Sequence, residues 1–275
     1  MNMAQDNARI AFIGGGNMAS AIIGGLVKQG LPAAQVTVVE PFAQARQKLQ
    51  AQFGIAADEH AGAALATASL VVWAVKPQTF KDAAAQARAH VQGALHLSVA
   101  AGIRSDSIAQ WLGTERIVRS MPNTPALVGK GMTALFARPA VNADDRQRVE
   151  QAIATTGEFL WVAQEAHLDA VTALSGSGPA YVFYFLEAMT KAGAEMGLSA
   201  EQARRLAVGT FAGASELARA SADPLELLRE RVTSKGGTTY AALMSLEQDQ
   251  VKASFVKALH AACTRAEQLG DEFGR

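Results

Sequence analysis

The chain has 275 residues, of which 49 % are hydrophobic and 18 % are charged. This composition supports a sizeable buried core and excludes an intrinsically disordered protein. The 25 basic and 25 acidic residues cancel to a formal net charge of zero. We therefore expect neither nucleic acid nor an anionic membrane surface as a partner. The length predicts one large domain or two moderate ones.

The sequence offers little for a disulfide, a metal or a membrane. The single cysteine, Cys263, excludes an intramolecular disulfide framework and a cysteine-based zinc site. The five histidines share no ligand spacing, so we predict no metal site. The N-terminal segment MNMAQDNAR has no apolar stretch, and every apolar run is well short of the ~20 residues that a membrane helix needs. We expect a cytoplasmic protein without a signal peptide.

Short apolar segments alternate with helical patterns in the first part of the chain. Several segments are apolar on both faces, which is typical of central strands in a parallel sheet covered by helices on both sides. The alternation predicts an α/β fold with a doubly wound sheet of the Rossmann type. The predicted strands are Arg9–Ile13, Val36–Glu40, Leu70–Val75, Leu95–Val99, Arg116–Met121, Met132–Ala137 and Phe159–Val162.

After Val162 the strand pattern stops and helical periodicity continues to the end of the chain. We therefore predict two domains, an α/β domain at residues 1–163 and an all-helical domain at residues 164–275. The helix expected from Pro179 is apolar nearly all round between Ala180 and Leu186, so it must be covered on every side. We expect a second copy of the chain to supply part of that cover.

A glycine-rich segment, Ile13-Gly-Gly-Gly-Asn-Met-Ala19, joins the first predicted strand to a helix. Gly14 permits a tight turn, Gly16 lets the backbone approach a pyrophosphate without a Cβ in the way, and Ala19 keeps the helix close to the strand. Free N–H groups and the positive end of the helix would face the phosphates. The segment predicts a dinucleotide site.

Glu40 ends the second predicted strand, where an acidic side chain accepts hydrogen bonds from the adenosine ribose hydroxyls and repels a 2′-phosphate. The alternative is a solvated charge at a strand end. The next basic residue, Arg46, lies along the following helix, and we do not expect it to help a 2′-phosphate. Glu40 therefore favours NADH, or use of both NADH and NADPH.

Three further turns follow predicted strands: Val75–Gln78, Ser98–Gly102 and Met121–Pro125. The carboxyl ends of parallel strands share one edge, where open α/β sheets bind ligands, so we expect these turns to contribute to one site. In the helical half, the loops Ser175–Gly178 and Val232–Thr239 each precede a helix. Their hydroxyls and backbone N–H groups suit an anion such as a substrate carboxylate.

Taken together, these segments resemble the pyrroline-5-carboxylate reductase family of proline biosynthesis. The resemblance runs from Ile10 to about Leu269 and rests on FIGGGNMASAIIGGL, AVKPQ, SVAAGI, RSMPNTPALVGKGMTAL, LSGSGPAYVF and VTSKGGTTYAAL, in the family's order and spacing. It implies a dinucleotide domain followed by a helical dimerisation domain. It also implies reduction of 1-pyrroline-5-carboxylate to L-proline with NADPH or NADH, by a homodimer or a ring of dimers.

The resemblance also implies roles for single residues. The implied catalytic residue is Thr239, which hydrogen-bonds the ring nitrogen of the substrate. The implied substrate-binding residues are Ser175, Gly176, Ser177, Gly178, Gly236, Gly237 and Thr238. The implied cofactor-binding residues are Ile13, Gly14, Gly15, Gly16, Asn17, Met18, Glu40, Ala74, Val75, Lys76, Pro77, Val99, Ala100, Ala101 and Asn123.

The sequence departs from the family at two places on the adenosine side. Many members carry Ser or Thr near the position of Glu40, where a 2′-phosphate is bound. Members also often carry an Asn in a loop that here reads Asp58-Glu-His-Ala61. Both departures bear on the choice between NADPH and NADH.

Two other functions stay open. A β-hydroxyacid dehydrogenase also joins a dinucleotide domain to a helical one, but it requires a lysine base early in the helical half. No lysine occurs between Lys130 and Lys191, and Lys191 lies about 18 Å along the helix from Pro179. A non-catalytic dinucleotide sensor would need the glycine turn but neither of the two loops in the helical half.

Overall fold

The structure is a computed structural model that describes residues 9–274. The outer ends of the two predicted domains, and most of the segment on which the signal-peptide expectation rests, lie outside these residues. Two compact units are formed: the described residues up to Ser177 together with residues 262–274, and Gly178–Ala261. By packing, residues 164–177 and 262–274 therefore group with the sheet. The division into two domains at residue 163 stays a prediction.

The first unit contains a seven-stranded sheet in the order β2-β1-β3-β4-β5-β6-β7. All seven predicted strands are confirmed, with ends that shift by one or two residues. The strands are β1 (Ile10–Ile13), β2 (Val36–Val39), β3 (Leu70–Trp73), β4 (Leu95–Ser98), β5 (Ile117–Met121), β6 (Gly131–Ala137) and β7 (Gly157–Trp161).

Every neighbouring pair of strands is parallel except β5 and β6, which are antiparallel. The expectation of a parallel sheet is wrong at this pair. The chain between the two strands, residues 122–130, is shorter than the dozen or more residues that a parallel crossover connection needs. The chain therefore turns back beside β5.

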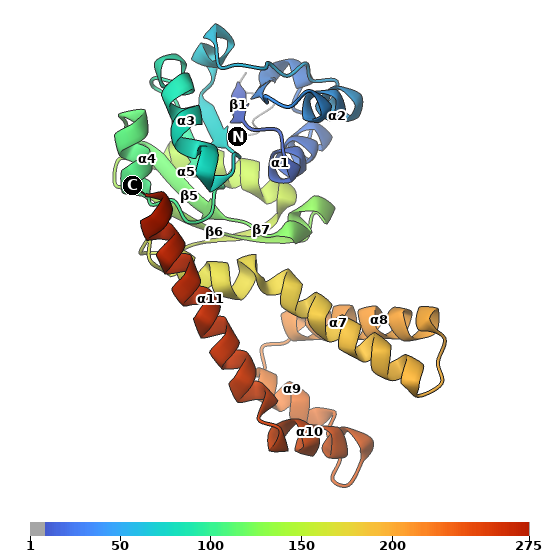
Figure 1. The fold of residues 1–275 in the computed structure, drawn as a ribbon. Helices are drawn as coiled ribbons and strands as arrows, with labels where there is room; N and C mark the ends of the chain where they lie inside the picture. The colour runs from blue at the N-terminus through green and yellow to red at the C-terminus, as the bar shows by residue number, and fades with distance from the viewer. Residues whose placement is uncertain (1–8, 275) are drawn as a thin grey trace. The chain divides into compact units, whose positions relative to one another are not determined.

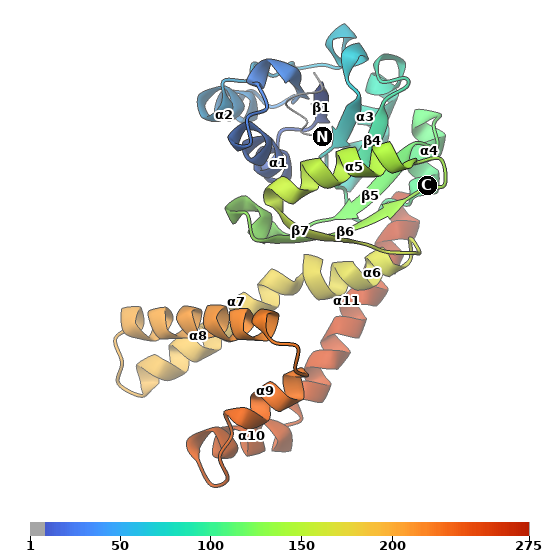
Figure 2. The same ribbon diagram turned by 180° about the vertical axis from the view of Figure 1, so that it is seen from behind.

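Helices cover both faces of the sheet (Figure 1). Figure 2, which is the view from the opposite side, shows α5 lying across the sheet. One buried cluster joins Ile22 of α1 and Val149 of α5 to Phe12 of β1. The other joins Phe80 of α3 and Ile108 of α4 to Trp73 of β3. The helices of this unit are α1 (Asn17–Lys28), α2 (Ala43–Phe53), α3 (Pro77–Ala87), α4 (Ser105–Leu112), α5 (Ala143–Ile153) and α6 (His167–Val171).

The second unit is helical. It contains α7 (Gly178–Glu195), α8 (Ala200–Ala220), α9 (Leu225–Arg231), α10 (Thr238–Gln248) and the first half of α11 (Val251–Phe273). A Cβ on Gly193 of α7 would lie 2.8 Å from the Cβ of Ala203 on α8, so the two helices pack closely at small residues. Phe183, Tyr184 and Leu217 are exposed within the single chain. No helix among residues 9–274 is long and apolar enough to cross a membrane.

Candidate functional site

The turns that follow four parallel strands meet at one edge of the sheet. Because β1, β3, β4 and β5 are parallel, their carboxyl ends point the same way. The chain leaves β1 through α1 toward β2 on one side, while β3 pairs with β1 on the other. Open α/β sheets bind ligands in the crevice at such a switch point. The predicted residues Gly14–Met18, Ala74–Pro77, Val99–Ala101 and Asn123 all follow these strands.

The glycine turn leaves room for a ligand where a side chain would otherwise stand. Gly14 has φ +98°, and a Cβ there would lie 2.6 Å from the carbonyl oxygen of Ala74. Gly16 is the N-cap residue that immediately precedes α1, and a Cβ there would meet no protein atom within 4 Å. No side chain caps α1 and no acidic residue lies in its first turn. An open backbone cradle at a positive helix end fits the diphosphate of a dinucleotide.

Glu40 is fixed beside this turn. Its Oε2 accepts a hydrogen bond from the Gly15 N–H at 2.8 Å, and its Oε1 accepts one from the Phe42 N–H at 2.9 Å. The side chain is buried, so the alternative of a solvated strand-end charge is wrong. A cavity of about 1070 Å³ opens next to the turn, and its lining includes Gly15, Gly16, Asn17 and Phe42.

Asn123 forms hydrogen bonds to the segment that leads into the helical unit. Its Nδ2 donates to Ser175 Oγ at 3.1 Å and to the Ser175 carbonyl at 3.3 Å. Its Oδ1 accepts from the Met132 N–H at 3.0 Å. Ser175 lies in a turn of π-helix, Thr172–Gly176, a feature frequent at functional sites. The amide of Asn123 therefore bonds to protein groups on both sides, and its contact with the cofactor stays a prediction.

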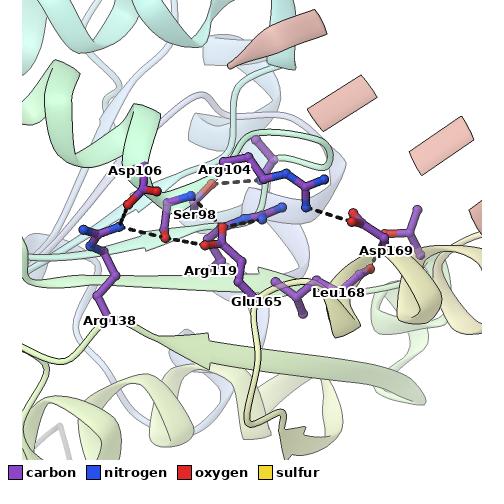
Figure 3. A network of polar contacts seen from close by, with 11 residues as sticks. Ser98, Arg104, Asp106, Arg119, Arg138, Glu165, Leu168 and Asp169 are labelled. Carbon is purple, nitrogen blue, oxygen red and sulfur yellow. Dashed lines mark hydrogen bonds and ion pairs between the residues drawn. The ribbon is translucent and has the colours of Figure 1, made fainter. Parts of the chain in front are cut away.

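A buried ion network ties the same segment to the sheet (Figure 3). Arg119 of β5 donates to Glu165 at 2.6 Å, and Arg104 donates to Asp169 of α6 at 2.7 Å. Glu165 also accepts from the N–H and the hydroxyl of Ser105, each at 2.6 Å. Arg104 and Ser105 follow the Ser98–Gly102 turn, so the network joins that turn to the chain that carries Ser175.

Burial and the partner's charge act in opposite directions on the pKa of each member of the Arg119–Glu165 pair. Burial lowers the pKa of Arg119, and the charge of Glu165 opposes that shift. Burial alone would raise the pKa of Glu165, but the hydrogen bond from Ser105 and the charge of Arg119 outweigh it and hold this pKa below its usual value. Sequence reasoning missed the network. An arginine inside an otherwise apolar strand was the available signal, because a buried charge needs a partner.

The predicted substrate loops fall in both units. Ser175, Gly176 and Ser177 belong to the sheet unit, and Gly178 begins α7 in the helical unit. Gly236 has φ +75°, and Gly237 precedes α10 without a side-chain cap on that helix. Thr238 is exposed and Thr239 is half-buried. That these two loops form one pocket stays a prediction.

Comparisons with known proteins extend along nearly the whole chain. Residues 165–269 match the family model described as pyrroline-5-carboxylate reductase dimerisation, and residues 9–102 match the one described as NADP oxidoreductase, coenzyme F420-dependent. The chain is 46 % identical over 270 residues to the pyrroline-5-carboxylate reductase of Pseudomonas aeruginosa. The matched region covers 97 % of this chain and 98 % of the relative. This chain belongs to the pyrroline-5-carboxylate reductase family.

Solved structures of reductases from this family agree with the fold. The enzyme from Coxiella burnetii has a TM-score of 0.89 at 36 % identity and covers 96 % of this chain and 99 % of its own. The Plasmodium falciparum enzyme, solved with NADP bound, has a TM-score of 0.87 at 28 % identity and covers 96 % and 99 %. The resemblance, the fold class and membership of an NAD(P)H-dependent reductase family are thereby confirmed.

We predict that two alanine substitutions in the glycine turn affect different properties, stability in one case and cofactor binding in the other. Gly14→Ala should lower the free energy of unfolding by roughly 1–3 kcal/mol, because it places a side chain at positive φ against the Ala74 carbonyl. Gly16→Ala should leave stability nearly unchanged but weaken NADPH and NADH binding, because its Cβ enters open space in the cradle. Thermal unfolding and nicotinamide fluorescence titration measure the two effects. Full cofactor affinity in Gly16→Ala would contradict a diphosphate at this turn.

Proposed function

We propose that this chain reduces 1-pyrroline-5-carboxylate to L-proline with NADPH or NADH. The observation that carries the proposal is the match of nearly the whole chain to reductases of that name. The open cradle at Gly16 and the uncapped start of α1 support a dinucleotide as the second substrate. The absence of a nucleophile–base pair among the predicted site residues suits this reaction, as the electrophile needs none.

A cyclic imine, once protonated on nitrogen, is already a strong electrophile at the adjacent carbon. Bound NADPH or NADH supplies the hydride that this carbon accepts. The task of the protein is to hold the two reacting carbons about 3–3.5 Å apart in the right orientation. We assign the backbone N–H groups of Gly15–Met18 to the diphosphate, and the turns Ala74–Pro77 and Val99–Ala101 to the nicotinamide side.

We assign the substrate to the two small loops. The N–H groups at Gly236–Thr238, before an uncapped helix, suit the carboxylate of the substrate. Thr239 lies one residue farther on and offers a hydroxyl for the ring nitrogen. Ser175–Gly178 completes the pocket in this proposal, with Ser175 held by Asn123.

The two rival functions are each disfavoured by a particular observation. A lysine base for alcohol oxidation would have to be Lys191, which is exposed on α7 and lies 3.8 Å from Glu195. A sensor that only binds a dinucleotide would not need the family's helical segment, yet residues 165–269 match it. Reduction of the imine remains the function that uses both halves of the chain.

We propose a cytoplasmic homodimer as the working form, without nucleic-acid or membrane partners. The dimerisation family model covers the whole helical unit, and large apolar side chains such as Phe183, Tyr184 and Leu217 are exposed in one chain. A second copy of the chain would cover such surface. Rings of dimers are a larger form of the same proposal.

Sedimentation at micromolar concentration should give a dimer or a multiple of it, and a stable monomer would contradict the proposal.

We predict that Thr239→Ala lowers kcat/KM for 1-pyrroline-5-carboxylate by roughly tenfold or more, or about 1.4 kcal/mol of transition-state binding. The reason is the loss of the hydroxyl that orients the ring nitrogen. Thr239→Ser keeps that hydroxyl and should retain most of the activity, and the dissociation constant for NADPH should not change in either variant. Steady-state kinetics with proline as the measured product test this, and unchanged kinetics in Thr239→Ala would remove the residue from the mechanism.

A further inference from the structure

An exposed ion pair lies beside the carboxyl end of β2. The segment around Asp58 extends the sheet there by a single bridge: the Asp58 N–H donates to the Val38 carbonyl, and the Glu40 N–H donates to the Asp58 carbonyl, each at 2.8 Å. Glu59 is the next residue, and its carboxylate accepts from Arg46 at 3.0 Å. The loop in which the family often carries an Asn therefore places a carboxylate at the end of β2.

Arg46 reaches back from α2 to the same place. Its Nη1 donates to the carbonyl oxygens of Glu40 at 2.9 Å and Pro41 at 2.7 Å, while Nη2 holds Glu59. The side chain of Arg46 therefore reaches the end of β2 although the residue lies on the following helix. The Arg46 side chain is 23 % exposed and that of Glu59 is 55 % exposed, so solvent and ligands can reach the pair.

The carboxylate of Glu40 is directed at backbone N–H groups and not at Arg46 or Glu59. Both of its carboxylate oxygens accept backbone N–H groups, from Gly15 and from Phe42, and the residue is buried. Accessible charges next to the end of β2 therefore include the carboxylates of Asp58 and Glu59 and the guanidinium of Arg46, and Glu59 is the carboxylate that pairs with Arg46. In folds of this kind the adenosine ribose lies at this end of the sheet, and an arginine nearby accommodates a 2′-phosphate.

We propose that Arg46 binds the 2′-phosphate of NADPH and that Glu59 is the anion that competes for it. Both anions need the same guanidinium donors, and a phosphate is a strong acceptor for them. Binding of NADPH therefore separates Arg46 from Glu59, whereas NADH leaves the ion pair intact. The inference rests on the proposed use of a nicotinamide dinucleotide, and it makes Glu59 a residue that tunes the preference between the two cofactors.

The test measures dissociation constants for NADPH and NADH by nicotinamide fluorescence, without the imine substrate. Arg46→Gln keeps a side-chain N–H for the backbone carbonyls but removes the charge. It should weaken NADPH binding by roughly tenfold, in line with a charge-assisted hydrogen bond, and change NADH binding by less than about threefold. Glu59→Gln should tighten NADPH binding by roughly two- to fivefold, as expected for an exposed pair, and leave NADH unchanged.

Two further variants sharpen the result. In the double variant Arg46→Gln with Glu59→Gln, the gain from Glu59→Gln should vanish, because the guanidinium is gone. Glu115→Gln is the matched control: Glu115 is similarly exposed and also pairs with an arginine, Arg138, so it removes the same charge from another ion pair of the sheet unit. It should change neither dissociation constant.

Equal changes for NADPH and NADH in Arg46→Gln would overturn the proposal, because they would mean that Arg46 only shapes the β2–α2 turn. Tighter NADPH binding in Glu115→Gln to the same degree as in Glu59→Gln would also overturn it, since net charge alone would then explain the gain. Binding of both cofactors without reduction of 1-pyrroline-5-carboxylate would contradict the proposed function and leave this inference standing. Failure of the unaltered protein to bind either cofactor would overturn both.

Discussion

The glycine turn after β1 is the constraint around which the dinucleotide edge of the sheet is built. Gly14 passes so close to the Ala74 carbonyl that no side chain fits between them. A Cβ on Gly15 would lie 2.7 Å from Leu49 and 3.3 Å from Glu40, so the turn also needs glycine to meet α2 and the end of β2. Because backbone rather than side chain fills this edge, N–H groups remain for a phosphate at Gly16.

The proposed reaction likewise needs few reactive side chains. A protonated imine accepts hydride without help from a nucleophile, so a site made of backbone N–H groups and small hydroxyl residues is sufficient if it is rigid. In the sheet unit, ion pairs and hydrogen bonds at and beside the predicted site residues supply this rigidity. Glu165 and Asp169 fasten the start of the helical segment to Arg119 and Arg104, and Asn123 holds Ser175 a few residues later. These contacts hold the chain around Ser175 in place, and we assign them no chemical step.

Local patterns in the sequence were enough for the strands and the glycine turn. Each strand is a short apolar run, and the steric demands of Gly14 follow from its place between a strand and a helix. The antiparallel direction of β6 could have been predicted, because the predicted strands Arg116–Met121 and Met132–Ala137 already leave too short a connection for a parallel crossover. The contacts of Arg46, Arg119 and Asn123 depend on segments distant in sequence, such as Glu59, Glu165 and Ser175, and no local pattern predicts which partner a polar side chain finds.

In the proposed reaction, hydride passes directly from the nicotinamide to the imine carbon. The most direct measurement uses NADPH carrying deuterium on the transferred position of nicotinamide C4, with 1-pyrroline-5-carboxylate in ordinary water, and mass spectrometry of the product. We predict L-proline with one deuterium on the ring carbon that was double-bonded to nitrogen, and no deuterium on that carbon when unlabelled NADPH is used in heavy water. Proline without the label from NADPH, or no proline at all, would contradict direct hydride transfer by this protein.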